Sequence, residues 1–187
     1  HVRSKQFLPL LEKEDGTIES MVQRVVRQAK AAGLTNAITL ATNTSQLDII
    51  TNQLGDTVSV VTEPECRDTF PAIALAASYL HFAKCCADDE VIVIMPCDPY
   101  TEADYFESIG KMVECVKRDV AELVLMGITP TYPSEKYGYV MPIASDNEYK
   151  MVSYFTEKPT VERAKELLAE NAYWNGGVFA FRLGYMM

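Results

Sequence analysis

Residues 90–95 are the segment that most restricts the fold, because Glu-Val-Ile-Val-Ile-Met is apolar or β-branched at almost every position. A strand that is apolar on both faces must be covered on both faces, which is typical of central parallel strands in α/β proteins. Residues 123–128, Leu-Val-Leu-Met-Gly-Ile, show the same pattern. The two runs predict a buried, mostly parallel sheet with helices on both sides.

Helical and strand patterns alternate along the rest of the chain. Apolar residues recur at helical spacing from residue 18 to residue 29, and Gly33 follows as a stop signal. Helices are predicted over residues 19–32, 45–54, 69–83, about 101–118 and 160–170. Strands are predicted over residues 37–42, 58–62, 90–95, 123–128, 139–143, 149–156 and 177–182. We expect one domain over residues 1–187, a doubly wound α/β fold with an antiparallel addition in its second half.

Charge and hydropathy exclude several classes of partner. The chain has 187 residues and a formal net charge of −9. Such an acidic surface argues against nonspecific binding of nucleic acid or of an anionic membrane. The sequence has no apolar run of about 18 residues, which a membrane-spanning helix would need, and residues 1–4 lack the apolar region of a signal peptide.

Cysteine and histidine usage argues against a zinc site, a disulfide framework and histidine-based catalysis. The five cysteines are odd in number and include no Cys-x-x-Cys pair, and the only histidines are His1 and His81. Reduced thiols that pack as small apolar side chains are the simpler explanation, so we expect a cytoplasmic protein. No Gly-x-x-x-x-Gly-Lys phosphate-binding loop is present either.

Asp98 follows the buried run directly, in Met-Pro-Cys-Asp-Pro. Ligands of doubly wound folds bind beyond the carboxyl ends of the strands, so the loops after Thr62, Met95 and Ile128 are site candidates. A carboxylate at this position can hold Mg²⁺, a cation that takes oxygen ligands and bridges phosphates. The alternative is a turn aspartate near Thr101, which can itself cap the following helix.

Residues 63–69, Glu-Pro-Glu-Cys-Arg-Asp-Thr, place charges between a strand end and a helix start. Free N–H groups at a helix N-terminus attract anions, and Arg67 can contact a phosphate or a base edge through two hydrogen bonds. The competing explanation is a solvated loop in which Asp68 caps the helix.

Two short polar segments lie in the second half of the chain. Glu157 and Lys158 could accept from sugar hydroxyls and neutralise a phosphate, although an ordinary exposed ion pair explains them as well. Asn175 precedes two glycines, which suits either close approach of a ligand or a tight turn. Gly138, between two tyrosines, permits a positive φ or close backbone approach. Lys5, near the start, would by itself be a surface lysine.

Taken in order, these segments resemble the mannose-1-phosphate guanylyltransferase family of sugar nucleotidyltransferases. The family carries Pro-Lys-Gln-Phe-Leu, Glu-Pro-x-Gly-Arg-Asn-Thr-Ala, Pro-x-Asp-His, Gly-Ile-x-Pro-Thr-x-Pro with Gly-Tyr-Gly-Tyr-Ile, Phe-x-Glu-Lys-Pro and Trp-Asn-Ser-Gly. The matching residues are 4–8, 63–76, 96–98, 127–133 with 136–140, 155–159 and 174–177. Six motifs in the right order over nearly the whole chain make the resemblance specific.

The resemblance implies a Rossmann-like sheet and a role for each candidate residue. Lys5 and Asp98 would be catalytic, Lys5 through the phosphates and Asp98 through Mg²⁺. The nucleotide-binding residues would be Glu63, Arg67, Asp68 and Thr69. The sugar-phosphate-binding residues would be Gly138, Glu157, Lys158 and Asn175. The implied substrates are GTP and mannose 1-phosphate, with GDP-mannose and pyrophosphate as products; self-association into a homo-oligomer stays an open alternative.

The sequence also departs from the family pattern. Ser4 replaces a proline, Cys66 a glycine, Asp68 an asparagine, Phe70 an alanine and Pro99 a histidine. The family's Gly-Gly-x-Gly-x-Arg loop has no counterpart, so we expect a fragment without that loop and without the C-terminal part, weakly active or inactive by itself. Two alternatives follow: another sugar 1-phosphate or nucleotide as substrate, or a non-catalytic paralogue that binds nucleotide sugars.

Overall fold

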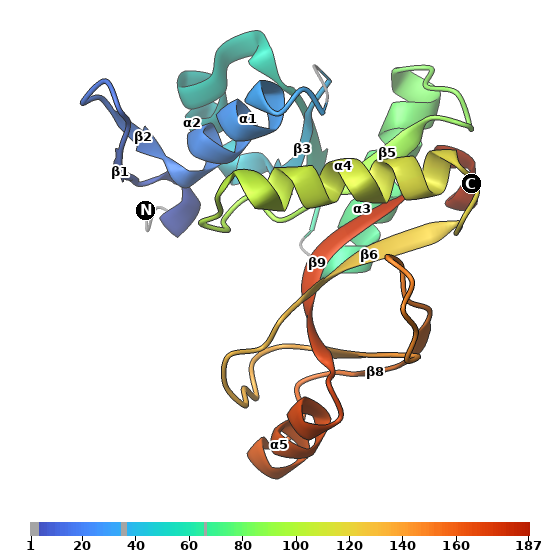
Figure 1. Cartoon of the computed structure of the whole chain (residues 1–187). Helices are drawn as coiled ribbons and strands as arrows, with labels where there is room; N and C mark the ends of the chain where they lie inside the picture. The colour runs from blue at the N-terminus through green and yellow to red at the C-terminus, as the bar shows by residue number, and fades with distance from the viewer. Residues whose placement is uncertain (1–3, 35–36, 66) are drawn as a thin grey trace. The chain divides into compact units, whose positions relative to one another are not determined.

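The structure is a computed structural model that describes residues 4–34, 37–65 and 67–187. The chain divides into two compact units (Figure 1). The first unit comprises residues 1–124 and 180–187, and the second comprises residues 125–179. Among the described residues, no helix is long and apolar enough to cross a membrane. Our expectation of one catalytic domain over residues 1–187 stays a prediction.

The first unit alternates helices and strands. Its helices are α1 (Met21–Ala31), α2 (Leu47–Leu54), α3 (Thr69–Ser78) and α4 (Ala103–Lys117). Its strands are β1 (Pro9–Glu12), β2 (Ile18–Ser20), β3 (Thr39–Asn43), β4 (Ser59–Glu63) and β5 (Val91–Ile94), and part of β6 (Leu123–Ile128) and of β9 (Tyr173–Arg182) belongs to it. Strands β3 and β4 run parallel, with Asn43 opposite Glu63 at their carboxyl ends, whereas β1 and β2 form an antiparallel hairpin.

The start of α1 shows how local chemistry sets an element boundary. Ser20 ends β2 and caps α1: its hydroxyl accepts from the Gln23 amide, and the Gln23 side chain accepts from the Ser20 amide. The buried face of α1 then packs into an apolar core with residues of η1 (Lys5–Phe7) and α2. The core residues are Phe7, Val22, Val26, Ile50 and Leu54. The helix predicted over residues 19–32 is therefore present, but it starts two residues later.

Two helical predictions need correction in detail. We expected Thr101 to cap the helix after β5, but α4 has Glu102 at its N-cap and no side-chain cap hydrogen bond. The Thr101 hydroxyl is buried and has no partner among the described residues. The helix predicted over residues 69–83 changes at Tyr79 into a short π-helix, Tyr79–Ala83.

The strands of the second unit form antiparallel pairs, β7 with β8 and β7 with β9. It contains β7 (Tyr139–Pro142), β8 (Val152–Thr156), α5 (Val161–Ala169) and most of β9. Helix α5 covers one face of this sheet, and its Ala164 and Leu167 are fully buried against Tyr139 and Met141. Thr160 caps α5 by accepting from the Arg163 amide.

Strand β9 pairs with three other strands, β5, β6 and β7. The strand order is β5-β9-β7-β8, and β6 also pairs with β9. We predicted a last strand over residues 177–182, but β9 begins at Tyr173, so Asn175 lies within the strand and not in a tight turn. The α/β class, with a parallel pair and an antiparallel addition in the second half, is confirmed.

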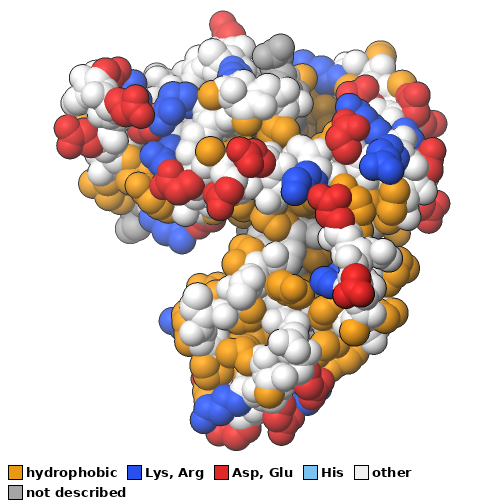
Figure 2. All heavy atoms as spheres, in the orientation of Figure 1, with side chains coloured by type: hydrophobic (Ala, Val, Ile, Leu, Met, Phe, Trp, Pro, Cys, Tyr) orange, Lys and Arg blue, Asp and Glu red, His pale blue; other side chains and the backbone are white. Residues whose placement is uncertain are grey.

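Charges of both signs are spread over the surface. On the face drawn in Figure 2, acidic and basic side chains are interspersed rather than gathered into one basic area. A nucleic-acid-binding surface needs a basic area of this kind. The face drawn in Figure 2 does not present one.

Candidate functional site

The first polar pair joins Lys5 and Asp98. Asp98 follows β5, and its Oδ2 lies 2.7 Å from the Nζ of Lys5 in η1. The Lys5 side chain is 80% exposed and that of Asp98 is 38% exposed. The hydrogen bond and the charge of Asp98 raise the pKa of Lys5 above its ordinary value. The two residues that we predicted to be catalytic are therefore in direct contact.

A cavity of about 210 Å³ lies next to this pair, bordered by the neighbours of both residues, Gln6 and Cys97. Its polar lining residues are Gln6, Thr42, Asn43, Gln46 and Glu63, and the rest of its wall is apolar. Burial, followed by the charge of Asp98, raises the pKa of the Cys97 thiol. The thiol therefore favours its neutral form and packs as an apolar wall residue.

Thr42 and Asn43 line this cavity but belong to none of the motifs found in the sequence. They lie at the carboxyl end of β3, and Asn43 pairs with Glu63 in the parallel ladder. The rule that ligands bind beyond the carboxyl ends of strands applies to this strand as well. The polar residues at the end of β3 could therefore have indicated this part of the site. We had applied the rule to the three loops that follow it along the chain.

The loop after β4 carries the predicted nucleotide-binding residues. Glu63 is the last residue of β4, and Thr69 is the first residue of α3. Asp68 has a φ of 72° and caps α3, accepting from the Thr69 amide at 2.8 Å. The helix-cap explanation of Asp68 is thus what the structure shows. Cys66, one of the departures from the family pattern, lies outside the described residues.

Arg67 is held within the same loop. Its guanidinium donates to the Glu65 carboxylate at 2.7 and 3.2 Å, and both side chains are largely exposed. The loop and α3 border an open cavity of about 500 Å³. Its lining residues are Glu63, Pro64, Glu65, Arg67, Pro71 and Leu75. A ligand that takes up Arg67 must therefore compete with Glu65 for the guanidinium.

In the second unit, strand register brings Gly138, Glu157 and Asn175 together. Tyr139, the first residue of the central strand β7, lies opposite Thr156 of β8 and Trp174 of β9. One step beyond Tyr139 therefore places Gly138 between Glu157 and Asn175. The Asn175 amide donates to the Gly138 carbonyl at 2.8 Å.

Gly138 leaves room that any other residue would fill. A Cβ at this position would lie 2.6 Å from Oε2 of Glu157 and 3.6 Å from Cβ of Asn175. Close approach, and not a positive φ, is thus the reason for a glycine here. The buried Tyr139 fixes the preceding loop, because its hydroxyl donates to the Ser134 carbonyl and accepts from the Ser134 amide.

Lys158 extends this polar group. Its Nζ lies 3.3 Å from Oε1 of Glu157, and both side chains are about two-thirds exposed. Lys158 has a φ of 40°, an uncommon conformation for a residue with a side chain. All four predicted sugar-phosphate residues thus lie at one end of the β8-β7-β9 sheet, whereas the other six predicted residues belong to the first unit.

Asp98 suits Mg²⁺ better than a metal that needs a complete protein cage. Among the described residues, no group of three or more His, Cys, Asp or Glu side chains could hold a metal ion. Mg²⁺ is usually bound through one or two carboxylates together with substrate phosphates and water. A single accessible carboxylate beside a lysine fits that mode.

Comparison with known proteins gives consistent matches. A family model described as Nucleotidyl transferase matches residues 1–187. The mannose-1-phosphate guanylyltransferase of Sinorhizobium fredii is 32% identical over 187 residues, covering 96% of this chain and 35% of the relative. The protein of the same name from Salmonella montevideo is 29% identical, covering 95% of this chain and 38% of the relative. The chain thus spans little more than a third of these relatives.

A solved structure matches the fold. The crystal structure described as a mannose-1-phosphate geranyltransferase from Thermus thermophilus superposes with a TM-score of 0.81 at 27% identity. The match covers 97% of this chain and 51% of that protein. An apo UDP-glucose pyrophosphorylase, at 14% identity and a TM-score of 0.68, shares the fold.

Proposed function

Because the chain belongs to the nucleotidyl transferase family, we propose that it takes part in the transfer of a nucleotidyl group to a sugar 1-phosphate. The observation that carries this proposal is the contact between Lys5 and Asp98 at the carboxyl end of β5. A cation and a carboxylate at such a strand end suit a reaction that depends on phosphate positioning and charge neutralisation. No covalent nucleophile is required.

The specific reaction we propose uses GTP and mannose 1-phosphate. A phosphate oxygen of mannose 1-phosphate attacks the α-phosphorus of GTP, the bond to the leaving group breaks in line, and GDP-mannose and pyrophosphate form. Support for these substrates comes from the names of the relatives, which are mannose-1-phosphate guanylyltransferases.

In this proposal the first unit handles the triphosphate. Lys5 neutralises charge on the phosphates, and Asp98 provides the carboxylate for Mg²⁺. When bound, Mg²⁺ would offset the charge that builds up on the phosphate oxygens. Lys5 must divide its charge between Asp98 and the substrate, and its raised pKa keeps it cationic throughout the neutral range.

The loop after β4 would contact the nucleotide. Arg67 can donate two parallel hydrogen bonds, and α3 begins at Thr69 with amides directed to the loop side. Glu63 borders both cavities of the first unit, so it can accept from ribose or base donors. Asp68, which already accepts from the Thr69 amide, would act by shaping the loop.

The second unit would bind the sugar phosphate. Glu157 and Asn175 offer acceptors for hydroxyls on either side of Gly138, whose missing side chain lets the Glu157 carboxylate approach the backbone closely. Lys158 can neutralise the phosphate from its position beside Glu157.

The decisive assay is pyrophosphate release by the gene product that contains this sequence, with Mg²⁺, GTP and mannose 1-phosphate. Wild-type protein should release pyrophosphate only when all three are present. Asp98→Asn should lower the rate by about a hundredfold or more, as expected when a charge-stabilising group is lost. A folded wild-type protein that releases none with any tested pair of nucleotide and sugar phosphate rejects the proposal.

A non-catalytic nucleotide-sugar-binding protein is the second candidate. It is favoured by the Asp68 carboxylate, which only accepts hydrogen bonds where the family pattern has an asparagine that also donates. Calorimetry with GDP-mannose separates the two: binding without pyrophosphate release supports the second candidate. ATP and other sugar 1-phosphates in the same assay test substrate choice.

A further inference from the structure

The loop that carries Asp98 is attached to helix α1 mainly through one arginine. The loop spans residues 95–102, between β5 and α4, and it has no regular secondary structure. The Arg24 Nη2 donates to the Thr101 carbonyl at 3.2 Å and lies 3.7 Å from Oε1 of Glu102. The guanidinium also covers the Tyr100 ring, at 4.5 Å from the ring centre. Arg24 thus contacts three consecutive residues of the loop.

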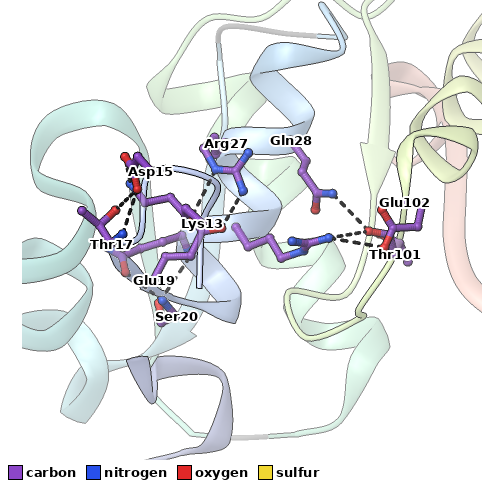
Figure 3. A network of polar contacts seen from close by, with 11 residues as sticks. Lys13, Asp15, Thr17, Glu19, Ser20, Arg27, Gln28, Thr101 and Glu102 are labelled. Carbon is purple, nitrogen blue, oxygen red and sulfur yellow. Dashed lines mark hydrogen bonds and ion pairs between the residues drawn. The ribbon is translucent and has the colours of Figure 1, made fainter. Parts of the chain in front are cut away.

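Gln28 adds a second attachment from the next turn of the same helix. Its Nε2 donates to the Thr101 carbonyl at 3.1 Å (Figure 3). This oxygen therefore accepts from two side chains of α1, those of Arg24 and Gln28. Residues four apart lie on one face of a helix, which explains why Arg24 and Gln28 reach the same atom. The Arg24 side chain is only 13% exposed, whereas that of Glu102 is 72% exposed.

We propose that Arg24, assisted by Gln28, is a positioning residue for Asp98. Only Pro99 separates Asp98 from Tyr100, and its ring fixes φ, which removes one of the torsions through which the loop could move independently of Tyr100. Lys5 contacts the Asp98 carboxylate directly, at 2.7 Å. Arg24 touches no predicted substrate atom in this scheme; it acts through the loop.

The guanidinium shape matters as much as the charge. A planar fork can stack on Tyr100 and donate to Thr101 at once, whereas a lysine ammonium is a compact point charge. Arg24→Lys should therefore keep part of the attachment and Arg24→Gln less. The simpler alternative is that Arg24 only supports the packing of α1 and contributes to stability.

Arg27 provides a matched control on the same helix. Its guanidinium contacts Glu19 of the hairpin, with Nε 3.1 Å from Oε2, and its contacts in Figure 3 do not reach the loop after β5. Glu19 is buried, so Arg27→Gln should lower stability by leaving that carboxylate without its partner. It should nevertheless leave the Asp98 loop unchanged.

The test compares the four proteins, wild type and the three variants, by hydrogen exchange and by binding of GTP with Mg²⁺. Arg24→Gln should speed exchange of peptides covering residues 97–110, which include the first hydrogen-bonded amides of α4, by about tenfold or more, because the loop before this helix loses a hydrogen bond to a charged group. It should also weaken Mg²⁺-dependent GTP binding several-fold in calorimetry, with GTP binding in EDTA unchanged. Arg27→Gln should speed exchange in residues 9–20 alone.

Either of two results overturns the proposal. One is loop exchange in Arg24→Gln no faster than in Arg27→Gln. The other is a faster-exchanging loop with unchanged Mg²⁺-dependent GTP binding, which leaves Arg24 a stability role alone. If Arg24→Gln does not fold, Arg24→Lys and Gln28→Ala are compared with Arg27→Gln in the same two measurements. The inference rests on the proposed role of Asp98, but a wild-type protein that binds GTP with Mg²⁺ and releases no pyrophosphate rejects the reaction and leaves this test intact.

Discussion

At the scale of single residues, a substitution of Gly138 should affect ligand binding more than the stability of the fold. An added Cβ would meet the end of the flexible Glu157 side chain, which can swing aside. Gly138→Ala should therefore change the free energy of unfolding by less than about 1 kcal/mol. If Glu157 binds mannose 1-phosphate as proposed, moving it should weaken that binding about tenfold, because a hydrogen bond to a charged group is lost. Urea unfolding and calorimetry measure the two effects.

Gly176 in the same unit is the natural comparison. Its added Cβ would lie 2.9 Å from the Met126 carbonyl oxygen, which is backbone and cannot swing aside. Gly176→Ala should cost about 1–3 kcal/mol of stability. If Gly138→Ala proves equally destabilising, close approach to Glu157 is not what requires a glycine at residue 138.

The partly buried Tyr105 should make the free energy of unfolding depend on pH in the alkaline range. Burial raises the pKa of Tyr105 to about 12. A folded-state pKa above the unfolded value means that the folded protein holds the proton more tightly. This contribution is complete below about pH 10 and is lost as the pH rises from about 10 to about 12. Urea unfolding at about pH 8 and about pH 11 should show a smaller loss for Tyr105→Phe than for wild type; equal losses would contradict the burial effect.

At the scale of elements, the two capped helices should respond unequally to loss of their caps. Ser20 is buried, caps α1 with a bond of 3.4 Å and also donates to the Gln53 side chain at 2.8 Å, whereas Thr160 is exposed and caps α5 with a single bond of 3.3 Å. Ser20→Ala should cost about 2 kcal/mol and Thr160→Ala about 1 kcal/mol or less. Denaturant unfolding with matched alanine variants checks this order, and the reverse order would refute it.

Helices and strands with a strong hydrophobic pattern could be predicted from the sequence. The residues at which several of them begin or end could not. The run of residues 123–128 has the bounds of β6, because its apolar character covers the whole strand, but Leu123 and Ile128 are exposed, so the strand is not buried throughout as predicted. Strand β9 is longer than predicted, because Trp174 and Asn175 gain backbone partners that only the folded sheet supplies. The β1–β2 hairpin was missed because its strands are only four and three residues long, and the buried residues of β2 are the polar Glu19 and Ser20, so no apolar alternation marks it.

The candidate site was predictable where strand ends fix it. Asp98 lies beyond the end of β5, and strand register brings Gly138, Glu157 and Asn175 together, whereas Lys5 belongs to η1 and its contact with Asp98 was not predicted. Thr101 and Arg24 show what sequence could not supply. The sequence suggests a cap at Thr101, but the carbonyl of this residue is instead bound by α1, which lies more than seventy residues earlier in the chain.

At the scale of the whole molecule, each unit has a separate apolar core. Val22 belongs to the core of the first unit and Leu167 to that of the second. Leu167→Ala should cost about 2–5 kcal/mol and speed hydrogen exchange chiefly in residues 125–179. Val22→Ala should do so in the first unit alone. Uniform acceleration over the whole chain by both variants would show that the units unfold together.

The chain leaves the first unit in β6 and returns to it in β9, and these two strands pair with each other. The second unit is therefore an insertion whose two connections are neighbours in a sheet. A segment of this kind can be exchanged between relatives as a cassette, since its ends already match. Recombination at residues 124 and 180 would then exchange the whole second unit, an evolutionary route to new combinations of units that leaves Lys5 and Asp98 in the retained first unit.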